Sequence, residues 1–547
     1  MRAADHIIDI GPGPGDAGGE ILYNGPADSF FASPPEKSVT ARCFAEERQI
    51  PAEPFTTRDN FTAINAGLNN LKNISVSFRQ HAFNVITGVS GSGKSSLADF
   101  LRNHSIPSGS GGCDAFSKVI HVDQSPIGRT PNSNPATYTG LSDHIRDLFA
   151  SLPESKARGF KKGQFSFVVR GGRCESCGGA GSQQVGMHFL GNVSVVCEDC
   201  NGKRFSEDTL SVHYRGKSIF DVLEMTLAEA HEFFSDQKKI RAYTSILSEL
   251  GLGYLKLGQA SNTLSGGEAQ RVKLATELVR SATSHTLYIL DEPTTGLHMA
   301  DVRVLLAALK SLIAKGHTLL CIEHDPFFIL HADHIADLGP GSGREGGSLV
   351  FSGSPAELLK HSESLTARAL RQYLERDFGQ MSRETRALSC DGDICLEGVR
   401  THNLKNISVS FPPESICLVS GRSGSGKSSL VIDTLYAESQ RRFMEGMSSY
   451  IRQFIGKAGN PELESATGLM PALCVEKKKA SGNPRSTAGT YTGLYDLYRL
   501  LFSRVATNGA GEKHGHSGGF SFNNESGACP QCKGLGSITT CDPEKLI

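Results

Sequence analysis

The feature that most constrains this chain is an internal repeat. The segment NLKNISVSF occupies residues 70–78 and again residues 403–411, and a Gly-rich segment, GxSGSGKSSL, occupies residues 88–97 and again residues 421–430. Two segments that recur in the same order indicate tandem copies of one folded unit. The sequence therefore predicts a repeating unit of about 330 residues, long enough for a complete domain.

The two ends of the chain are out of step with this repeat. Residues 6–22 (HIIDIGPGPGDAGGEIL) match residues 334–350 (HIADLGPGSGREGGSLV), so the chain opens with the end of a unit. We expect an excerpt of a longer tandem protein; a broken reading frame and a permuted gene product are the alternatives. The expected parts are the tail of a preceding domain with its linker (1–60), a complete domain (61–375), a linker (376–394) and the first part of a second domain (395–547).

Composition and charge exclude several classes of protein. The net charge is -1, so a nucleic-acid surface would have to be a local patch. No apolar run approaches the roughly 20 residues that span a bilayer, and the start of the chain lacks the layout of a signal peptide. Some of the 14 cysteines form Cys-x-x-Cys pairs, which indicates metal binding in a reducing compartment. We expect a cytoplasmic protein without a membrane partner.

The Gly-rich segment predicts a phosphate-binding loop. It lies between a β-branched strand and a helix, where backbone N–H groups can surround phosphate oxygens. Lys94 would reach the β- and γ-phosphates of ATP, and the Ser95 hydroxyl would ligate Mg²⁺. A flexible Gly/Ser loop is the alternative, which the recurrence of the whole pattern disfavours. The residues expected to bind nucleotide are Gly88, Ser90, Gly91, Ser92, Gly93, Lys94, Ser95 and Ser96, with Gly421, Gly424, Gly426, Lys427, Ser428 and Ser429 in the second copy.

Two later strands end in side chains that suit ATP hydrolysis. An apolar strand ends in Asp291, which would hold Mg²⁺ through water, and in Glu292, which would polarise the attacking water. The strand TLLCIEHD ends near His324, whose imidazole would sense or orient the γ-phosphate. An acidic turn and a structural histidine are the alternatives, so the prediction depends on the combination.

The segment LSGGEAQRVKLATEL (264–278) completes that combination. It opens a predicted helix, whose N-terminus attracts anions. With LYILDEP and the strand-terminal histidine, the chain resembles the ATP-binding-cassette ATPases. In that family the LSGGE helix of one nucleotide domain caps the ATP held by the phosphate loop of a second. The resemblance assigns Gln124 to the link between nucleotide and partner domain, and assigns nucleotide contacts to Ser265, Gly266, Gly267 and Glu268.

An insertion between the phosphate loop and this helix carries two Cys-x-x-Cys pairs. The two pairs are nineteen residues apart, and four thiolates at such spacing complete a tetrahedral zinc site. The ligands would be Cys174, Cys177, Cys197 and Cys200. Disulfides or core thiols are the alternatives. We place the zinc module at about 156–205 and the helical region with the signature at about 206–280.

A basic stretch lies beside the first cysteine pair. Residues 156–173 contain Lys156, Arg158, Lys161, Lys162, Arg170 and Arg173, no acidic residue, and Phe160, Phe165 and Phe167 between them. Basic residues with interleaved aromatics favour contacts to a nucleic-acid backbone. A solvated basic face explains the charge pattern equally well.

A cassette ATPase with a four-cysteine insertion and tandem units resembles the UvrA family, the damage-sensing ATPases of bacterial nucleotide excision repair. RGGRCESC, MHFL and DLGPGSGREGG look like the family's C-terminal nucleotide domain, and DTLYAESQRRF and NPRSTAGT look like its N-terminal one. The resemblance implies an α/β fold of tandem cassette (P-loop NTPase) domains with a zinc-binding insertion, and ATP, Mg²⁺ and Zn²⁺ as cofactors. It also implies an ATP-dependent homodimer that binds damaged double-stranded DNA and hands it to a helicase-like UvrB partner, as a component of the excinuclease but not the nuclease.

The chain departs from the family pattern in several places. The second unit has no LSGGE, no DEP and no switch histidine, and Lys477 stands where a counterpart of Gln124 is expected. Cys529 and Cys532 align with the first cysteine pair, but no second pair follows. The partner-docking domain expected between residues 509 and 520 is absent, as in a shorter branch linked to damage tolerance and drug resistance. A transporter- or ribosome-associated cassette ATPase and a remnant that only binds nucleotide are the competing functions.

Overall fold

The computed structural model describes most of the chain. The described residues are 1–46, 59–104, 116–279 (without 124, 126, 129–131 and 188–190), 285–375, 392–447, 460–475, 485–507 and 516–538. They divide into two compact units, Met1–Ala472 and Leu473–Ile547. The larger unit contains two domains built around separate sheets, which are described first. No helix among these residues is both long and apolar enough to cross a membrane.

A six-stranded sheet forms the centre of the first domain, with the strand order β12-β11-β5-β10-β9-β6. All its neighbouring strands are parallel except the edge pair β11 and β12. Parallel strands covered by helices are buried on both faces, which explains why these strands are nearly continuous apolar runs. The strands are β5 (Phe83–Gly88), β6 (Lys118–Val122), β9 (Thr286–Asp291), β10 (Thr318–Ile322), β11 (His334–Gly339) and β12 (Ser348–Gly353).

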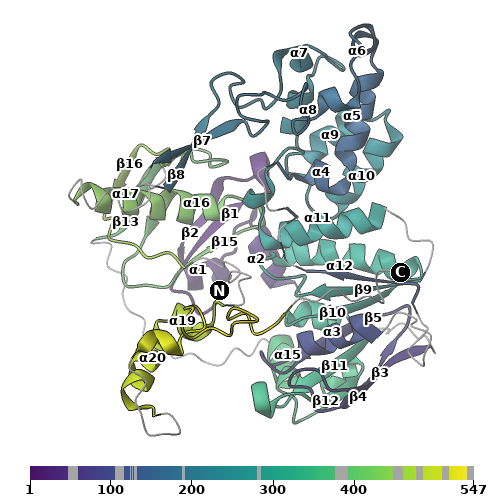
Figure 1. Cartoon of the computed structure of the whole chain (residues 1–547), viewed down its shortest axis with the longest axis vertical. Helices are drawn as coiled ribbons and strands as arrows, with labels where there is room; N and C mark the ends of the chain where they lie inside the picture. Colours follow the sequence, from purple (N-terminus) through teal and green to yellow (C-terminus); the bar gives the residue numbers. More distant parts are fainter. Residues whose placement is uncertain are drawn as a thin grey trace. The chain divides into compact units, whose positions relative to one another are not determined.

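Helices cover this sheet, and a small hairpin lies beside it (Figure 1). The hairpin strands β3 (Asn60–Ala66) and β4 (Ile74–Arg79) pair antiparallel, and they share a hydrophobic core with one face of the sheet. The covering helices are α3 (Lys94–His104), α11 (Gly266–Val279), α12 (Met299–Ala314), α13 (Pro326–Leu330), α14 (Pro355–Leu358) and α15 (Leu365–Glu375).

The insertion between β6 and α11 folds as a helical subdomain that carries a β-hairpin flanked by two cysteine pairs. Local sequence sets its helix starts, since Ser218 with Asp221 and Thr226 with Glu229 form capping boxes. Its helices are α4 (Pro135–Thr139), α5 (Leu141–Ser151), α6 (Pro153–Ala157), α7 (Glu207–Leu210), α8 (Ile219–Glu224), α9 (Leu227–Phe233) and α10 (Lys238–Glu249). The hairpin strands are β7 (Ser182–Met187) and β8 (Gly191–Val196).

The second domain is assembled from both ends of the larger unit. Strand β1 (His6–Gly11) pairs parallel with β15 (Cys417–Ser420) and antiparallel with β2 (Glu20–Pro26). The purple β1 and green β15 lie side by side in Figure 1. The tail expected to belong to a preceding domain thus lies in one sheet with the strand before the second phosphate loop.

The remaining elements of the second domain complete this arrangement. A second three-stranded sheet has the order β14-β13-β16. Its strands are β13 (Ile394–Val399), β14 (Ile407–Phe411) and β16 (Ser465–Thr467). The helices are α1 (Ala27–Ala32), α2 (Val39–Ala45), α16 (Lys427–Leu430) and α17 (Ala437–Glu445), with a π-helical turn at Val431–Tyr436. Among the described residues this domain has no counterpart of β9 or β10.

The smaller unit contains helices α19 (Ala488–Tyr491) and α20 (Leu494–Val505). Its large apolar side chains are exposed along α20, including Leu497, Tyr498 and Leu501. The expected second domain (395–547) therefore lies partly in each compact unit, and its boundaries stay a prediction.

Candidate nucleotide sites and cysteine centre

The first phosphate loop follows β5 and leads into α3. Gly88 has a φ of 132°, and a Cβ there would lie 2.0 Å from the Leu338 carbonyl oxygen, so the close approach of β11 requires glycine. Lys94 lies over the loop, because its Nζ donates to the carbonyl oxygens of Gly88 at 3.0 Å and Val89 at 2.8 Å. This places an ammonium at the N-terminus of α3, a position suited to bind phosphate.

The two carboxylates of the first site, Asp291 and Glu292, stand at the carboxyl end of strand β9. In the sheet, β9 is the second strand from β5. Strand β10 lies between them, and its Ile322 is in register with both Asp291 and Ile86. The carboxyl ends of the three strands therefore meet at one edge. Burial lowers the pKa of Lys94, and the negative charges of Glu292, Asp337 and Asp291 oppose that shift. The predicted phosphate loop and carboxylates are thus close enough to interact.

Glu292 and His324 face each other at this edge. The His324 Nε2 lies 3.6 Å from the Glu292 Oε1, and the Thr295 hydroxyl donates to the Glu292 Oε2 at 3.0 Å. Glu292 has a φ of 43°, an uncommon conformation for a residue with a side chain. Burial lowers the pKa of His324, and the positive charge of Lys94 lowers it further. A neutral imidazole beside a carboxylate can accept or relay a proton.

Glu323 is a residue of this site that sequence reasoning missed. Its side chain is 2% exposed. Its Oε1 accepts the Thr294 N–H at 2.7 Å, and its Oε2 accepts the His324 N–H at 2.8 Å. Burial raises the pKa of Glu323, while these N–H groups lower it. The carboxylate therefore ties the loop after Glu292 to the loop that carries His324. The sequence does contain a signal for this role, because Glu323 is a charged residue at the end of an apolar strand and directly precedes His324.

The second phosphate loop repeats the geometry of the first. The Lys427 Nζ donates to the carbonyl oxygens of Gly421 at 2.8 Å and Arg422 at 2.6 Å. Asn403 bonds the Gly424 carbonyl at 3.2 Å, as Asn70 bonds the Gly91 carbonyl at 3.0 Å. Burial lowers the pKa of Lys427, and the charges of Asp301, Glu268 and Asp9 oppose this shift.

The signature helix α11 faces this second loop across a cavity of about 690 Å³. Tyr254 closes one side of the cavity, since a Cβ on Gly424 would lie 2.6 Å from its ring. The Tyr254 hydroxyl donates to Glu268, which also accepts the Ser265 N–H at 2.8 Å. The lining residues are Tyr254, Gln259, Thr263, Ser265, Glu268, Gly296, His402, Asn403, Ser423, Gly424, Gly426, Lys427, Ser428, Ser429 and Asp433.

Each of the two sites therefore has only part of the expected motif set within the described residues. The first has the loop, the carboxylates and His324, but no signature segment lies against it. The second has the loop and the signature, but its described lining contains no carboxylate pair at a strand end. Gln124 and Lys477 lie outside the described residues.

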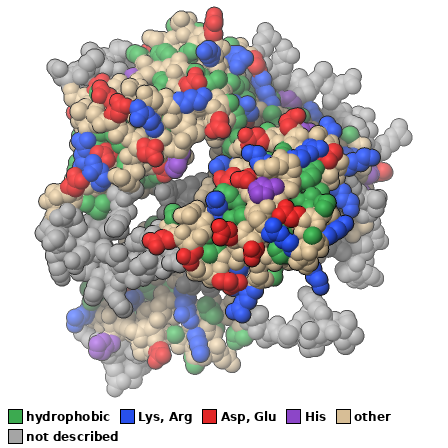
Figure 2. Space-filling model, turned by 90° about the horizontal axis from the view of Figure 1, so that it is seen from above, with side chains coloured by type: hydrophobic (Ala, Val, Ile, Leu, Met, Phe, Trp, Pro, Cys, Tyr) green, Lys and Arg blue, Asp and Glu red, His purple; other side chains and the backbone are tan. Residues whose placement is uncertain are grey.

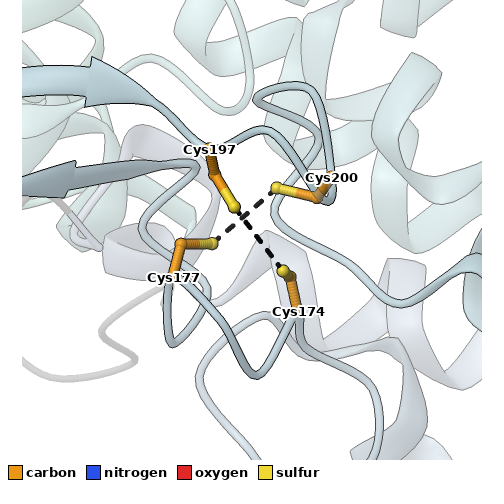
Figure 3. A group of neighbouring side chains, drawn as sticks. All are labelled: Cys174, Cys177, Cys197 and Cys200. Atoms are coloured by element: carbon orange, nitrogen blue, oxygen red, sulfur yellow. Dashed lines mark hydrogen bonds between the residues drawn. The ribbon is translucent and has the colours of Figure 1, made fainter.

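The four predicted zinc ligands come together in the insertion (Figure 3). Their sulfur atoms all lie within 4.8 Å of one another, and the pairs Cys174–Cys197 and Cys177–Cys200 are 3.9 and 3.7 Å apart. These separations exceed the roughly 2.05 Å of a disulfide bond. Four thiols around one point form the donor set of a closed tetrahedral zinc site, so the residues fit the metal. In the smaller unit, Cys529 is exposed and Cys532 half-buried.

The basic stretch beside this centre is only partly available to a ligand. Phe165 and Phe167 are buried, and Lys162 forms an ion pair with Asp147 at 3.0 Å. Arg158 pairs with Glu154, and Arg173 with Glu175. Exposed basic residues remain at Lys156, Lys161 and Arg170. The described side chains on the face in Figure 2 mix basic and acidic groups, without a broad area of one sign.

Comparison with known proteins identifies relatives over most of the chain. Residues 187–295 match the family model described as ABC transporter. UvrABC system protein A of Staphylococcus epidermidis is 47% identical over 393 residues, covering 69% of this chain and 41% of that protein. The Bacillus subtilis protein of the same name is 48% identical over 397 residues, covering 70% of this chain and 41% of that protein.

A solved structure agrees with these relatives. The crystal structure of UvrA2 from Deinococcus radiodurans has a TM-score of 0.64 and 46% identity, and covers 68% of this chain and 47% of that one. The fold class predicted from the sequence, an α/β cassette ATPase fold, is confirmed. The chain spans about two fifths of the length of the curated relatives it matches.

Proposed function

We propose, since the chain belongs to the UvrA family of ATP-binding-cassette proteins, that it acts as an ATP-dependent, damage-recognising DNA-binding ATPase in nucleotide excision repair. The observation that carries the proposal is the meeting of Lys94, Glu292 and His324 at one edge of the first domain's sheet. The four-cysteine centre next to the signature subdomain supports assignment to this family rather than to a transporter cassette.

The first site has the groups required for hydrolysis. Lys94 and the N–H groups of its loop would bind the β- and γ-phosphates, and Glu292 would accept a proton from the attacking water. His324 would orient the γ-phosphate beside Glu292. Ser95 and Asp291 would hold Mg²⁺, which neutralises charge on the phosphate oxygens. No signature segment lies against this loop among the described residues, so turnover is proposed to need one from another domain, as in a homodimer.

The second site is proposed to bind ATP without hydrolysing it. Lys427 and the loop from Gly421 to Ser429 supply the phosphate contacts, and Ser265 approaches from the signature helix. The acidic residues of the described lining are Glu268 and Asp433. Glu268 already accepts from Tyr254 and Ser265, so its carboxylate is a poor candidate for a general base.

The cysteine centre is proposed to bind zinc and to stabilise a DNA-contacting module. A closed four-thiolate shell leaves no open position for chemistry, so its role is structural. The exposed Lys156, Lys161 and Arg170 lie in the segment before the centre and are the proposed phosphate contacts. The remaining proposals for this protein are a cytoplasmic location and a UvrB-like helicase partner.

Binding of damaged and undamaged duplexes tests the repair function. We expect the chain, with ATP, to bind a duplex carrying a bulky lesion more tightly than the same undamaged duplex. Affinity for both should fall as salt rises, because phosphate contacts release counterions. The control is the triple variant Lys156→Gln/Lys161→Gln/Arg170→Gln, which should weaken binding to both duplexes. Equal affinity for the two duplexes at every salt concentration would contradict the repair function.

A further inference from the structure

The loop that leads into the cysteine centre carries two exposed valines. Val168 and Val169 are 51% and 47% exposed. A Cβ added to Gly163 would lie 3.8 Å from the Val169 side chain, so this valine lies over the turn that begins at Lys161. Lys161 is exposed, as is Arg170, which directly follows the valines. The loop therefore presents two apolar side chains next to two basic ones.

The smaller unit contains a second copy of this loop, at residues 517–528. In the first copy the Val168 N–H donates to the Ser166 Oγ at 3.3 Å. In the second copy the Asn523 N–H donates to the Ser521 Oγ, also at 3.3 Å. Each copy begins with a single turn of 3-10 helix. The two loops therefore share one backbone conformation at this position.

The exposed side chains of the two copies nevertheless differ completely. The first copy has Val-Val-Arg at residues 168–170, where the second has Asn-Asn-Glu at residues 523–525, and all six side chains are exposed. Lys161 is likewise replaced by His516. Because both sequences adopt the same turn, the turn itself does not require apolar or basic side chains. The valines and the positive charge of the first copy are therefore available for contact with a ligand.

DNA, the ligand of the proposed function, has the chemistry that suits this loop. The cationic side chains of Lys161 and Arg170 suit backbone phosphates, which are present in regular and distorted DNA alike. Valine gains free energy only where it leaves water for another apolar surface. The faces of the bases are covered by stacking in a regular duplex and become accessible where stacking is broken, and apolar side chains of other proteins enter between bases there. Unstacking costs less where the DNA is already damaged or mismatched.

From this arrangement, which rests on the proposed function, we infer that Val168 and Val169 form an apolar contact with unstacked bases and thereby favour distorted over regular DNA. The basic residues beside them increase the affinity for both kinds of DNA. Preference is a difference between two binding free energies. The two kinds of side chain therefore have separable effects: the valines set the ratio of the two affinities, and Lys161 and Arg170 set their common level.

The second copy of the loop supplies the matched variants for a test. Val168→Asn/Val169→Asn and Arg170→Glu each introduce residues that the same turn already holds in the second copy. Ile64→Asn is the control, because Ile64 is 67% exposed on β3 and undergoes the same change from a β-branched apolar residue to an amide. The full chain, with ATP, is titrated with a fluorescent regular duplex and with the same duplex carrying a central mismatched bubble.

The preference is the affinity for the bubble duplex divided by that for the regular duplex. We expect Val168→Asn/Val169→Asn to lower it by at least about fivefold, the effect of losing burial of two half-exposed valines. Affinity for the regular duplex should change by less than about twofold, because the phosphate contacts remain. Arg170→Glu should weaken binding to both duplexes and leave the preference unchanged. Val168→Ile/Val169→Ile should keep the preference, and Ile64→Asn should alter neither affinity.

Limited proteolysis near residues 174–205 shows whether the double asparagine variant is still folded, and Val168→Ala/Val169→Ala decides if it is not. An unchanged preference in the folded variant, or an equal loss of affinity for both duplexes, would overturn the inference while leaving the proposed function intact. A wild type that binds the two duplexes equally would contradict the proposed function, and the inference with it.

Discussion

Ser420 donates a hydrogen bond to Asp9 at 2.6 Å, although 411 positions of sequence separate them. Asp9 is buried and also accepts from Ser38 at 2.6 Å and Thr40 at 2.8 Å. Asp337 takes the same place in the first domain, where it accepts from Ser364 and Thr366. The bonds of Asp9 fasten the start of the chain to the strand that precedes the second phosphate loop.

Asp9→Ala should destabilise the second domain selectively. The variant leaves buried hydroxyl groups without their acceptor, which costs about 1–3 kcal/mol each at most. Hydrogen exchange followed by mass spectrometry should show faster exchange in β1 and β15 and little change in β5 and β11. Asp337→Ala should give the reverse pattern. Equal effects of Asp9→Ala on both domains would contradict this assignment.

Glu292→Gln should abolish turnover while retaining nucleotide. The amide keeps the shape of the carboxylate but cannot accept a proton, and loss of a general base lowers rates by about 10²- to 10⁴-fold. Lys94→Ala should instead weaken binding at the first site. Phosphate release and equilibrium binding of labelled ATP distinguish the two effects. Full turnover in the Glu292→Gln variant would show that Glu292 is not the general base.

Glu323→Gln should reduce turnover more than it reduces ATP affinity. The carboxylate accepts N–H groups on both oxygens, and an amide turns one of these acceptors into a donor. We expect kcat to fall about tenfold, the effect of about 1.4 kcal/mol of lost positioning. Glu357→Gln, at the cap of α14, is the control. A change confined to KM would show that Glu323 does not position Glu292 and His324.

Stability should fall in mild acid because of His334. Burial lowers the pKa of His334 to about 4, so the unfolded chain binds a proton more readily than the folded one. Its contribution is fully present above pH 6.5 and is lost as pH falls from 6.5 towards 4, by up to about 3 kcal/mol. Urea unfolding of the wild type and His334→Asn at pH 7 and pH 5 measures this. If the free energy of unfolding depends on pH equally in the wild type and in His334→Asn, the pH dependence belongs to groups other than His334.

Removal of metal should destabilise the insertion more than it destabilises the sheet domains. Chelation at pH 7, or Cys197→Ser, takes away a ligand set whose binding energy contributes to local folding. We expect one zinc per chain by a metal-sensitive dye and faster proteolysis near residues 174–205 after chelation. Cys43→Ser, a cysteine outside the group, is the control. Absence of bound metal in the purified wild type would contradict the zinc assignment.

Local patterns explain what the sequence could predict. The loop at Lys94 and the cysteines around Cys177 are fixed by neighbours a few residues away, so spacing alone indicates their chemistry. The site bonds of Glu323 and the pairing of Arg422 with Asp301 depend on strands and domains brought together by folding. The match between residues 6–22 and 334–350 did contain the missing information, because the pairing of β11 with β5 predicts that of β1 with β15.

The pairing of β1 with β15 also sets an order of events during synthesis. A ribosome adds about 5–20 residues per second, so β1 emerges roughly 20–80 seconds before β15 exists to pair with it. The first domain, encoded between them, can fold during this interval. Strand β2 can pair with one edge of β1 early, but the edge of β1 that pairs with β15 must meanwhile stay open and avoid other strand edges.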